Sequence, residues 1–173
     1  MVLNPQAPKR HGAAMVEMTF VSLIFFMFLF GIVEYCRFLY VQQVITNACR
    51  EGARFAIVHT NIDDPDTTDD EFVVQTREIV ERKLVGLQNG LENYALTIYR
   101  VDLQGNKVYL LDENGDVVQE NGDDVLAPAN DAEFGEFIVV EITGDFEPIL
   151  PSLLLMGNRI PISGKAFMNS EAN

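Results

Sequence analysis

The sequence has few of the residues from which catalytic and metal sites are usually built. It contains only two cysteines, Cys36 and Cys49, and two histidines, His11 and His59, which lie far apart and lack the spacing of metal ligands. No CxxC, HExxH or glycine-rich phosphate-loop pattern occurs. Carboxylates are numerous, but no two of them pair in an identifiable pocket. We therefore expect a protein that is not an enzyme and that has no cofactor and no metal site.

Positive charge is also scarce and is unevenly distributed. The chain has 12 basic and 26 acidic residues, a net charge of -14. Residues 1–60 carry five basic and three acidic residues (net +2), whereas residues 61–173 carry seven basic and 23 acidic residues (net -16). The acidic part repels phosphate backbones and anionic lipid surfaces, which excludes a nucleic-acid partner. We expect a solvated domain held away from the membrane.

The hydrophobic residues gather in one long run near the start of the chain. Ala13 to Val33 is long enough to cross the hydrocarbon core of a bilayer and has Glu17 as its one charge. Lys9 and Arg10 precede it, so the positive-inside rule places the N-terminus in the cytoplasm. No small-residue cleavage site follows the run, which argues against a secretory signal peptide. The sequence predicts a single-pass anchor in a bacterial inner membrane, with an extracytoplasmic C-terminal domain.

The helical pattern continues beyond the membrane edge. Residues 35–58 contain no proline, and their apolar residues recur every three or four positions, which is typical of an amphipathic helix. Ala48, Gly52 and Ala56 form a row of small residues that lets another helix approach closely. This helix-packing row serves either the protein's own soluble domain or a neighbouring subunit, and the sequence leaves both open. If Cys36 and Cys49 share one helix, they lie about 20 Å apart and cannot bridge within the chain.

The remaining residues predict a second helix followed by strands. Thr68 and Glu71 have the spacing of a capping box, and Asn89-Gly90 is the predicted end of that helix. A period of two predicts strands at residues 94–103, 107–111, 116–119, 136–146 and 158–168, with a hairpin turn at Asn114-Gly115. The apolar residues between the last two strands predict a packed loop or a short helical turn, since they are too few to span a membrane.

The predicted fold class is α+β. A long N-terminal transmembrane and amphipathic helix is followed by a second helix packed on a small antiparallel sheet. The predicted domains are a basic leader (residues 1–12), the long helix (13–58) and an acidic extracytoplasmic domain (59–173).

The start of the apolar run has two features with a chemical meaning. Gly12 offers a backbone without a side chain, which a membrane-embedded protease can bind in an extended form. Glu17 is a carboxylate within an apolar segment, where an acid is a functional hypothesis by default. If the chain were cut after Gly12, Ala13 would carry a new ammonium group, and Glu17 lies four residues on, on the same helical face. Glu17 then neutralises that amine in its own chain or in a neighbour, or else lies hydrated near the membrane surface.

A glycine followed five residues later by a glutamate, behind a basic leader and at the head of an apolar helix, resembles the type IV prepilin processing site. The segment from Lys9 to Ile57 is similar to the TadE-like family, with Gly-Ala-Ala-Met-Val-Glu, then Gly-Ile-Val-Glu, then Thr-Asn-Ala-Cys-Arg-Glu-Gly-Ala-Arg in order. A weaker similarity covers the C-terminal end, from Phe146-Glu147-Pro148 onward.

The resemblance implies a minor pseudopilin of the tight-adherence, or Flp, pilus system with a pilin-like fold. Its implied partners are the lipid bilayer, a prepilin peptidase and other pseudopilin or pilus-assembly subunits. Carried over by position, the junction of Gly12 and Ala13 is the processing site, and Glu17 is the recognition and assembly residue. One position departs from the pattern, because Met18 stands where many processed Flp-system pilins carry an aromatic residue.

An alternative hypothesis comes from the acidic segments. The chain would then be an unprocessed, permanently anchored extracytoplasmic binding module whose acidic face binds a cation or a basic partner. Asp112, Asn114 and Asp116 have part of the spacing of a calcium-binding loop, but Val117 occupies the position of its required glycine. A plain hairpin turn explains the same residues.

Overall fold

The fold is seen in a computed structural model that describes residues 11–59, 69–112, 114–120, 122–132, 135–151 and 157–169. Its helices are α1 (His11–His59) and α2 (Asp69–Leu84), with short 3-10 helices at η1 (Leu87–Gly90) and η2 (Ala129–Asp131). Its strands are β1 (Glu92–Val101), β2 (Gln119–Glu120), β3 (Asp123–Asp124), β4 (Phe137–Phe146) and β5 (Ile160–Asn169).

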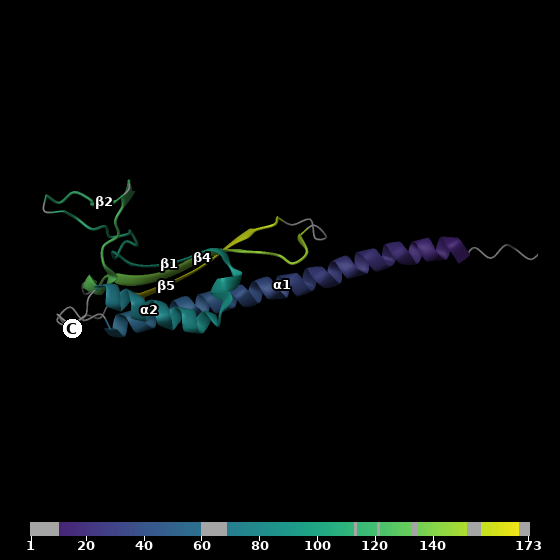
Figure 1. Ribbon diagram of the computed structural model, residues 1–173, viewed down its shortest axis with the longest axis horizontal. Coiled ribbons are helices and arrows are strands. Elements are labelled where there is room, and N and C mark those ends of the chain that lie inside the picture. Colours follow the sequence, from purple (N-terminus) through teal and green to yellow (C-terminus); the bar gives the residue numbers. More distant parts are fainter. Residues whose placement is uncertain are drawn as a thin grey trace, which may run out of the picture.

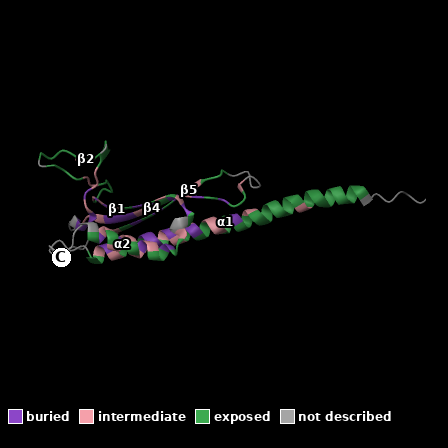
Figure 2. Ribbon diagram, viewed as in Figure 1, coloured by how far each residue is buried: buried purple, intermediate pink, exposed green. Residues whose placement is uncertain are grey.

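Helix α1 is continuous over 49 residues, which corresponds to a length of about 73 Å. Its N-terminal half projects from the rest of the molecule as a rod (Figure 1), and none of its side chains from Gly12 to Val33 is buried. Figure 2 shows the change along the rod from exposed residues to a half that is partly covered. The first buried residue of α1 is Glu34, at 5% exposure. The predicted long helix is therefore confirmed, and its two halves have different surroundings.

Three strands form an antiparallel sheet in the order β1-β4-β5. The central strand, β4, pairs Val140 with Ile98 of β1 and with Ala166 of β5. Because β5 is an edge strand, it accommodates Pro161, which has no backbone N–H to donate. Both long helices lie on the same side of this sheet (Figure 1), so the predicted α+β class is confirmed.

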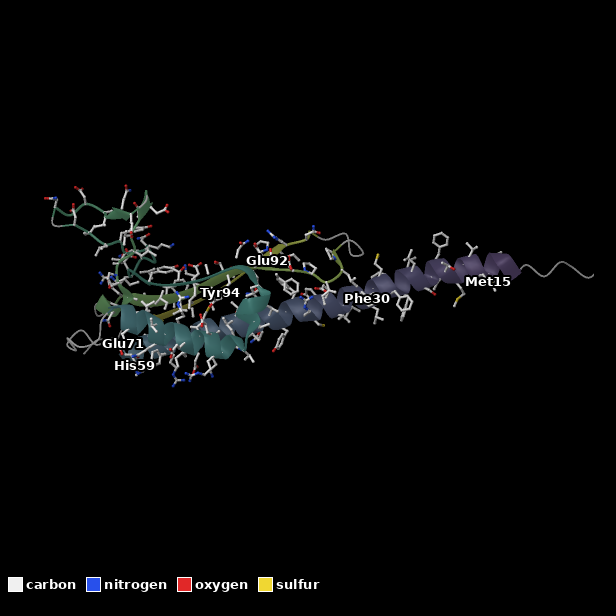
Figure 3. All side chains as sticks on the ribbon, viewed as in Figure 1. Met15, Phe30, His59, Glu71, Glu92 and Tyr94 are labelled. Atoms are coloured by element: carbon white, nitrogen blue, oxygen red, sulfur yellow. The ribbon has the colours of Figure 1, made fainter. Side chains whose placement is uncertain are left out.

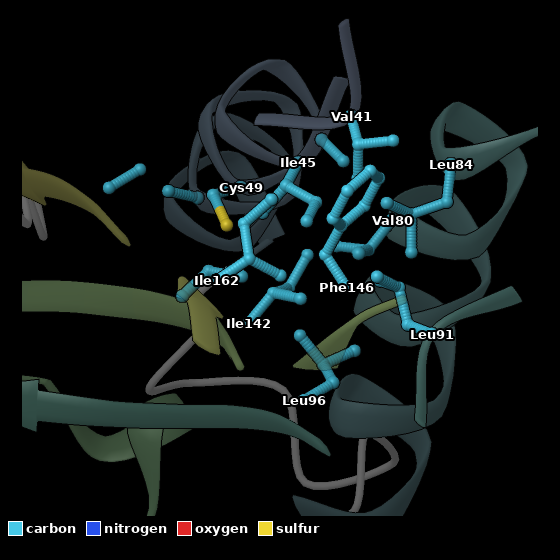
Figure 4. Close-up of a cluster of buried hydrophobic side chains, with 14 residues drawn as sticks. Val41, Ile45, Cys49, Val80, Leu84, Leu91, Leu96, Ile142, Phe146 and Ile162 are labelled. Atoms are coloured by element: carbon cyan, nitrogen blue, oxygen red, sulfur yellow. The ribbon is translucent and has the colours of Figure 1, made fainter. Parts of the chain in front are cut away.

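The main core lies between the sheet and the two helices. Alternate residues of β4, among them Val140, Ile142 and Phe146, point toward the helices because side chains of a strand alternate between its faces. Figure 4 shows Ile142 and Phe146 among side chains of α1 and α2. The buried residues of the main core are Val41, Ile45, Ala48, Cys49, Ala53, Val80, Leu84, Leu91, Leu96, Val140, Ile142, Phe146, Ile162 and Ala166.

Two glycines allow α1 to approach its neighbours closely. A Cβ atom added to Gly164 of β5 would lie 2.5 Å from Cγ2 of Ile45, and one added to Gly52 of α1 would collide with Val80 of α2. The Cys49 thiol donates a hydrogen bond of 3.2 Å to the carbonyl of Gly164. These contacts fix the amphipathic half of α1 to both α2 and β5.

The predicted end of the second helix is wrong. Helix α2 ends at Leu84 rather than at Asn89-Gly90, because Val85 and Gly86 adopt left-handed backbone conformations with φ of 54° and 82°. The chain then turns into η1, and Leu87 packs against the main core from there. A leucine three residues after Leu84 fits the apolar face of a longer helix equally well, which is why periodicity misplaced the end.

The predicted long strands are confirmed, with ends that differ by at most two residues. The hairpin prediction is confirmed at the turn, where Gly115 has a φ of 87°. Across the turn, Leu111 forms an antiparallel bridge with Val117, and the Val118 N–H donates a hydrogen bond of 2.8 Å to the Leu110 carbonyl. The two arms of the hairpin form isolated bridges rather than continuous strands, and the second arm runs on into β2, which pairs with β3. The proposed cap residue Thr68 lies outside the described residues, as do residues 152–156 of the predicted loop or turn between β4 and β5.

Candidate functional site

The predicted processing residues lie at the free end of α1. Gly12 and Ala13 belong to the first turn of the helix, and a Cβ atom added to Gly12 would meet nothing within 4 Å. Figure 3 shows Met15, in the same part of α1, projecting from the rod far from the sheet. Glu17 is exposed in the described chain, one helical turn after Ala13. A peptidase that binds an extended substrate would have to unwind this first turn, which costs little because no tertiary contact holds it.

The small-residue row has a different environment. Ala48, Gly52 and Ala56 are all buried within the described part of the chain. Gly52 faces Val80 of α2 and Val140 of β4, and Ala56 belongs to a second buried cluster. The row therefore contacts the chain's own domain.

A buried polar group lies where α1 leaves the domain. Glu34 is buried, and its Oε1 atom accepts a hydrogen bond of 2.7 Å from Nη1 of Arg37, one turn along the helix. The same oxygen accepts a bond of 3.2 Å from the backbone N–H of Ile149, which lies just after β4. A buried carboxylate is stable only when its charge is compensated in this way.

Arg37 extends the same network to the sheet. Its Nη2 atom donates a hydrogen bond of 2.9 Å to the carbonyl of Glu147, and its guanidinium carbon lies 4.6 Å from the centre of the Phe146 ring. Phe38 meets Phe146 edge-on at 5.5 Å. Arg37 and Glu34 thus connect α1 to the end of β4, and we call Glu34, Arg37, Phe146, Glu147 and Ile149 the border cluster.

An apolar cavity adjoins the border cluster. It has a volume of about 380 Å³ and is lined by Gly31, Glu34, Tyr35, Phe38 and Phe146. Sequence reasoning missed this site, although Glu34 and Arg37 directly follow the apolar run at helical spacing. That spacing could have predicted the Glu34–Arg37 pair. The backbone groups of Glu147 and Ile149 that also bind these two side chains lie more than 100 residues away in the chain, so the spacing does not predict them.

Two groups outside the border cluster, Cys49 and Tyr99, have pKa shifts with structural explanations. Burial raises the pKa of the Cys49 thiol to about 11. Burial, followed by the hydrogen bond of 2.7 Å that its hydroxyl donates to Glu141, raises the pKa of Tyr99. Neither group lines the cavity beside the border cluster.

The described residues contain no group of three or more histidine, cysteine, aspartate or glutamate side chains placed to hold a metal. The carboxylate of Asp112 instead accepts hydrogen bonds from the backbone N–H groups of Asn114 and Asp116, at 2.8 and 2.9 Å. Those bonds lower the pKa of Asp112. They are the bonds of an Asx turn, so the hairpin explains these residues. Most of the acidic loop before α2 lies outside the described residues.

Comparison with protein families gives one match, to residues 12–54, by the model of the TadE-like protein family. This part of α1 is a TadE-like segment. It includes the free end of the helix, the helical part of the border cluster and the first two residues of the small-residue row. No curated protein and no solved structure matches the chain.

The TadE-like segment coincides with the one helix in the described chain that is long and apolar enough to cross a membrane. The chain therefore carries a TadE-like segment on a helix that is able, by its length and composition, to anchor it in a membrane.

Proposed function

We propose that this TadE-like protein is a minor pseudopilin that takes part in assembling a Tad/Flp-type pilus or secretion apparatus in the bacterial inner membrane. Its N-terminus lies in the cytoplasm and its acidic domain outside. The observation that carries the proposal is the position of the TadE-like segment on α1, half of which is free of the domain and half of which is packed into its core.

This division of α1 supports an assembly role. The buried half, with Ala48 and Gly52, is already occupied by the chain's own α2 and β4. The exposed half therefore offers the surface for lateral contacts with other pseudopilin or pilus-assembly subunits in the lipid. In lipid, close packing and polar groups, rather than the hydrophobic effect, hold helices together. Glu17 is the acid within that surface.

Processing would place a positive charge next to this acid. A prepilin peptidase that cuts between Gly12 and Ala13 leaves an ammonium group on Ala13, one turn from Glu17. In the low dielectric of the membrane, the pair is favourable when the two charges compensate each other and costly when one is missing. Glu17 can form that pair with its own amine or with that of a neighbouring subunit, which gives a physical basis for recognition during assembly.

Mass spectrometry of the mature protein in its native cells tests the proposal. The wild-type chain is expected to begin at Ala13, and Gly12→Val is expected to retain Met1 and to lose surface pili, because a branched side chain blocks the extended backbone. Gly31→Ala, in the same helix, is the matched control and should be processed normally. A wild-type protein that retains Met1 while pili assemble would contradict the proposal.

The Glu17→Gln variant tests whether the Glu17 carboxylate is needed for pilus assembly. We expect this variant to be found in the membrane but to support few or no pili, because the uncharged amide cannot neutralise the new amine. Glu51→Gln, which changes a half-exposed carboxylate in the domain-bound half of α1, is the control. Normal piliation with Glu17→Gln would exclude an assembly role for this carboxylate.

A further inference from the structure

The connection that follows β4 presents apolar side chains to its surroundings. Ile149 is 68% exposed and Leu150 is 36% exposed. Figure 1 shows the described part of this connection reaching from the sheet along α1, toward the helix's free half. Single exposed apolar residues are common on protein surfaces. Two adjacent ones beside a helix that is able to cross a membrane can instead contact the lipid.

The position of Ile149 relative to the bilayer follows from the length of α1. Residues 13–33 span about 31 Å as a helix, close to the thickness of the hydrocarbon core, about 30 Å. Glu34 is the next residue, so its side chain lies at the boundary between hydrocarbon and headgroups. The backbone nitrogen of Ile149 is 3.2 Å from Glu34 Oε1. Ile149 and Leu150 therefore lie at the level of that boundary.

The buried charge at this level, that of Glu34, is compensated. Glu34 is paired with Arg37, and Arg37 also binds the carbonyl of Glu147. The guanidinium lies against Phe146, with 37% of the Arg37 side chain exposed. An arginine in this setting keeps its stem in apolar surroundings while its charged end reaches water or headgroups. Ile32, Val33 and Tyr35, next to Glu34 on α1, are exposed apolar residues as well.

We propose that Ile149 and Leu150 insert into the interfacial region of the bilayer beside α1, as a second contact between the protein and lipid. A neighbouring copy is a less suitable occupant, because residues 61–173 of each copy carry a net charge of -16 and repel one another. A single helix leaves the domain free to tilt, whereas two contacts at one membrane surface restrict its tilt. The inference rests on the membrane anchoring of α1 and not on processing at Gly12.

The chain contains no tryptophan, so a single introduced indole reports on its own surroundings. The full-length protein is reconstituted, at high lipid excess, in phosphatidylcholine vesicles with or without brominated acyl chains. Three variants are compared, Ile149→Trp at the border, Leu103→Trp beyond the far end of β1 and Phe25→Trp on the exposed half of α1. Leu103 is the matched control because it is also an apolar loop residue, with 72% exposure.

The proposal predicts that the indole at position 149 emits at shorter wavelength than the one at position 103. Brominated lipid should quench most of its fluorescence, and aqueous iodide should quench it weakly. The opposite quenching pattern is expected at position 103. Equal emission and iodide quenching at positions 149 and 103, without quenching by lipid, would overturn the proposal. Shielding at position 149 that disappears when the protein is diluted into more lipid would overturn it in favour of a subunit contact.

The indole at position 25 distinguishes failure of the second lipid contact from failure of the membrane anchoring of α1. Quenching there by brominated lipid, without quenching at position 149, shows that α1 is anchored and refutes only the second contact. If position 25 is also unquenched, the anchoring itself fails. An unchanged circular dichroism spectrum in all three variants establishes that the fold is intact.

Discussion

At the residue scale, Glu34 is a buried acid that two distant parts of the chain hold in place. Its Oε1 atom serves both Arg37 and the Ile149 N–H, so one carboxylate connects α1 to the residues after β4. The charge pattern of the sequence draws attention to Glu17, which is exposed, rather than to Glu34, which is buried. The difference arises because Glu34 is followed by a domain that folds back over it.

Replacing the Glu34 carboxylate tests this connection. Glu34→Gln is expected to lower the free energy of unfolding by about 1–3 kcal/mol, because the amide loses the charge-assisted bond from Arg37. The loss of unfolding free energy should lie near the lower end of this range, because Arg37 is partly exposed and water can compensate its charge. Urea unfolding of the full chain in detergent measures the effect.

Glu51→Gln is the matched control for this measurement. Glu51 also pairs with a basic side chain, but the Glu51–Lys83 distance is 3.7 Å and both side chains are about half exposed. Its replacement should cost less than about 1 kcal/mol. Equal effects of the two substitutions would show that burial of Glu34 does not strengthen its ion pair.

At the scale of elements, the packing of α1 on β5 depends on a missing side chain. Gly164→Ala is expected to destabilise the protein by about 1–3 kcal/mol, because the new methyl group would lie 2.5 Å from Ile45 and α1 would have to shift. Gly52 is a less decisive position, since alanine there also gains about 1 kcal/mol of helix propensity. Thermal unfolding followed by circular dichroism is the measurement.

Gly144 provides the control for this substitution within the same sheet. A Cβ atom added there would have its nearest neighbours at 3.4 Å, Glu92 and Leu91, which require only a small adjustment. Gly144→Ala should therefore be much closer to neutral than Gly164→Ala. If both alanines are tolerated equally, the close approach of α1 to β5 is wrong.

At the scale of the whole molecule, the membrane helix and the domain share one core. Val41, Ile45 and Cys49 of α1 are buried among residues of α2, β4 and β5. The amphipathic half of α1 is therefore a structural part of the C-terminal domain as well as a continuation of the apolar half of the helix. This shared core lets a force applied to the anchor reach the sheet directly.

A comparison of two fragments tests the shared core. The fragment 34–173 retains the amphipathic half of α1 and is expected to be soluble, with one cooperative thermal transition. The fragment 59–173 lacks the helix that covers the sheet, and we expect it to show no cooperative transition, because its core would be exposed to water. Cooperative unfolding of the shorter fragment would contradict the shared core.

Local features of the sequence determined the elements themselves. The unbroken apolar run and the period of three and four in residues 35–58 predicted α1 as one helix, and a period of two predicted the three long strands to within two residues. These features were readable because hydrophobic periodicity is local, and each element repeats its own signal over many residues. The Asn114-Gly115 turn was readable for the same reason, since its chemistry lies within four residues.

Only the tertiary structure decided which surfaces those elements bury. Whether the row of Ala48, Gly52 and Ala56 contacts the chain's own domain or a subunit depended on the position of α2 and β4, which helical spacing does not contain. The partners of Glu34 and Arg37 depended on the return of the chain after β4, more than 100 residues later. Contacts of this kind form from the balance of packing over the whole core, so no local pattern records them.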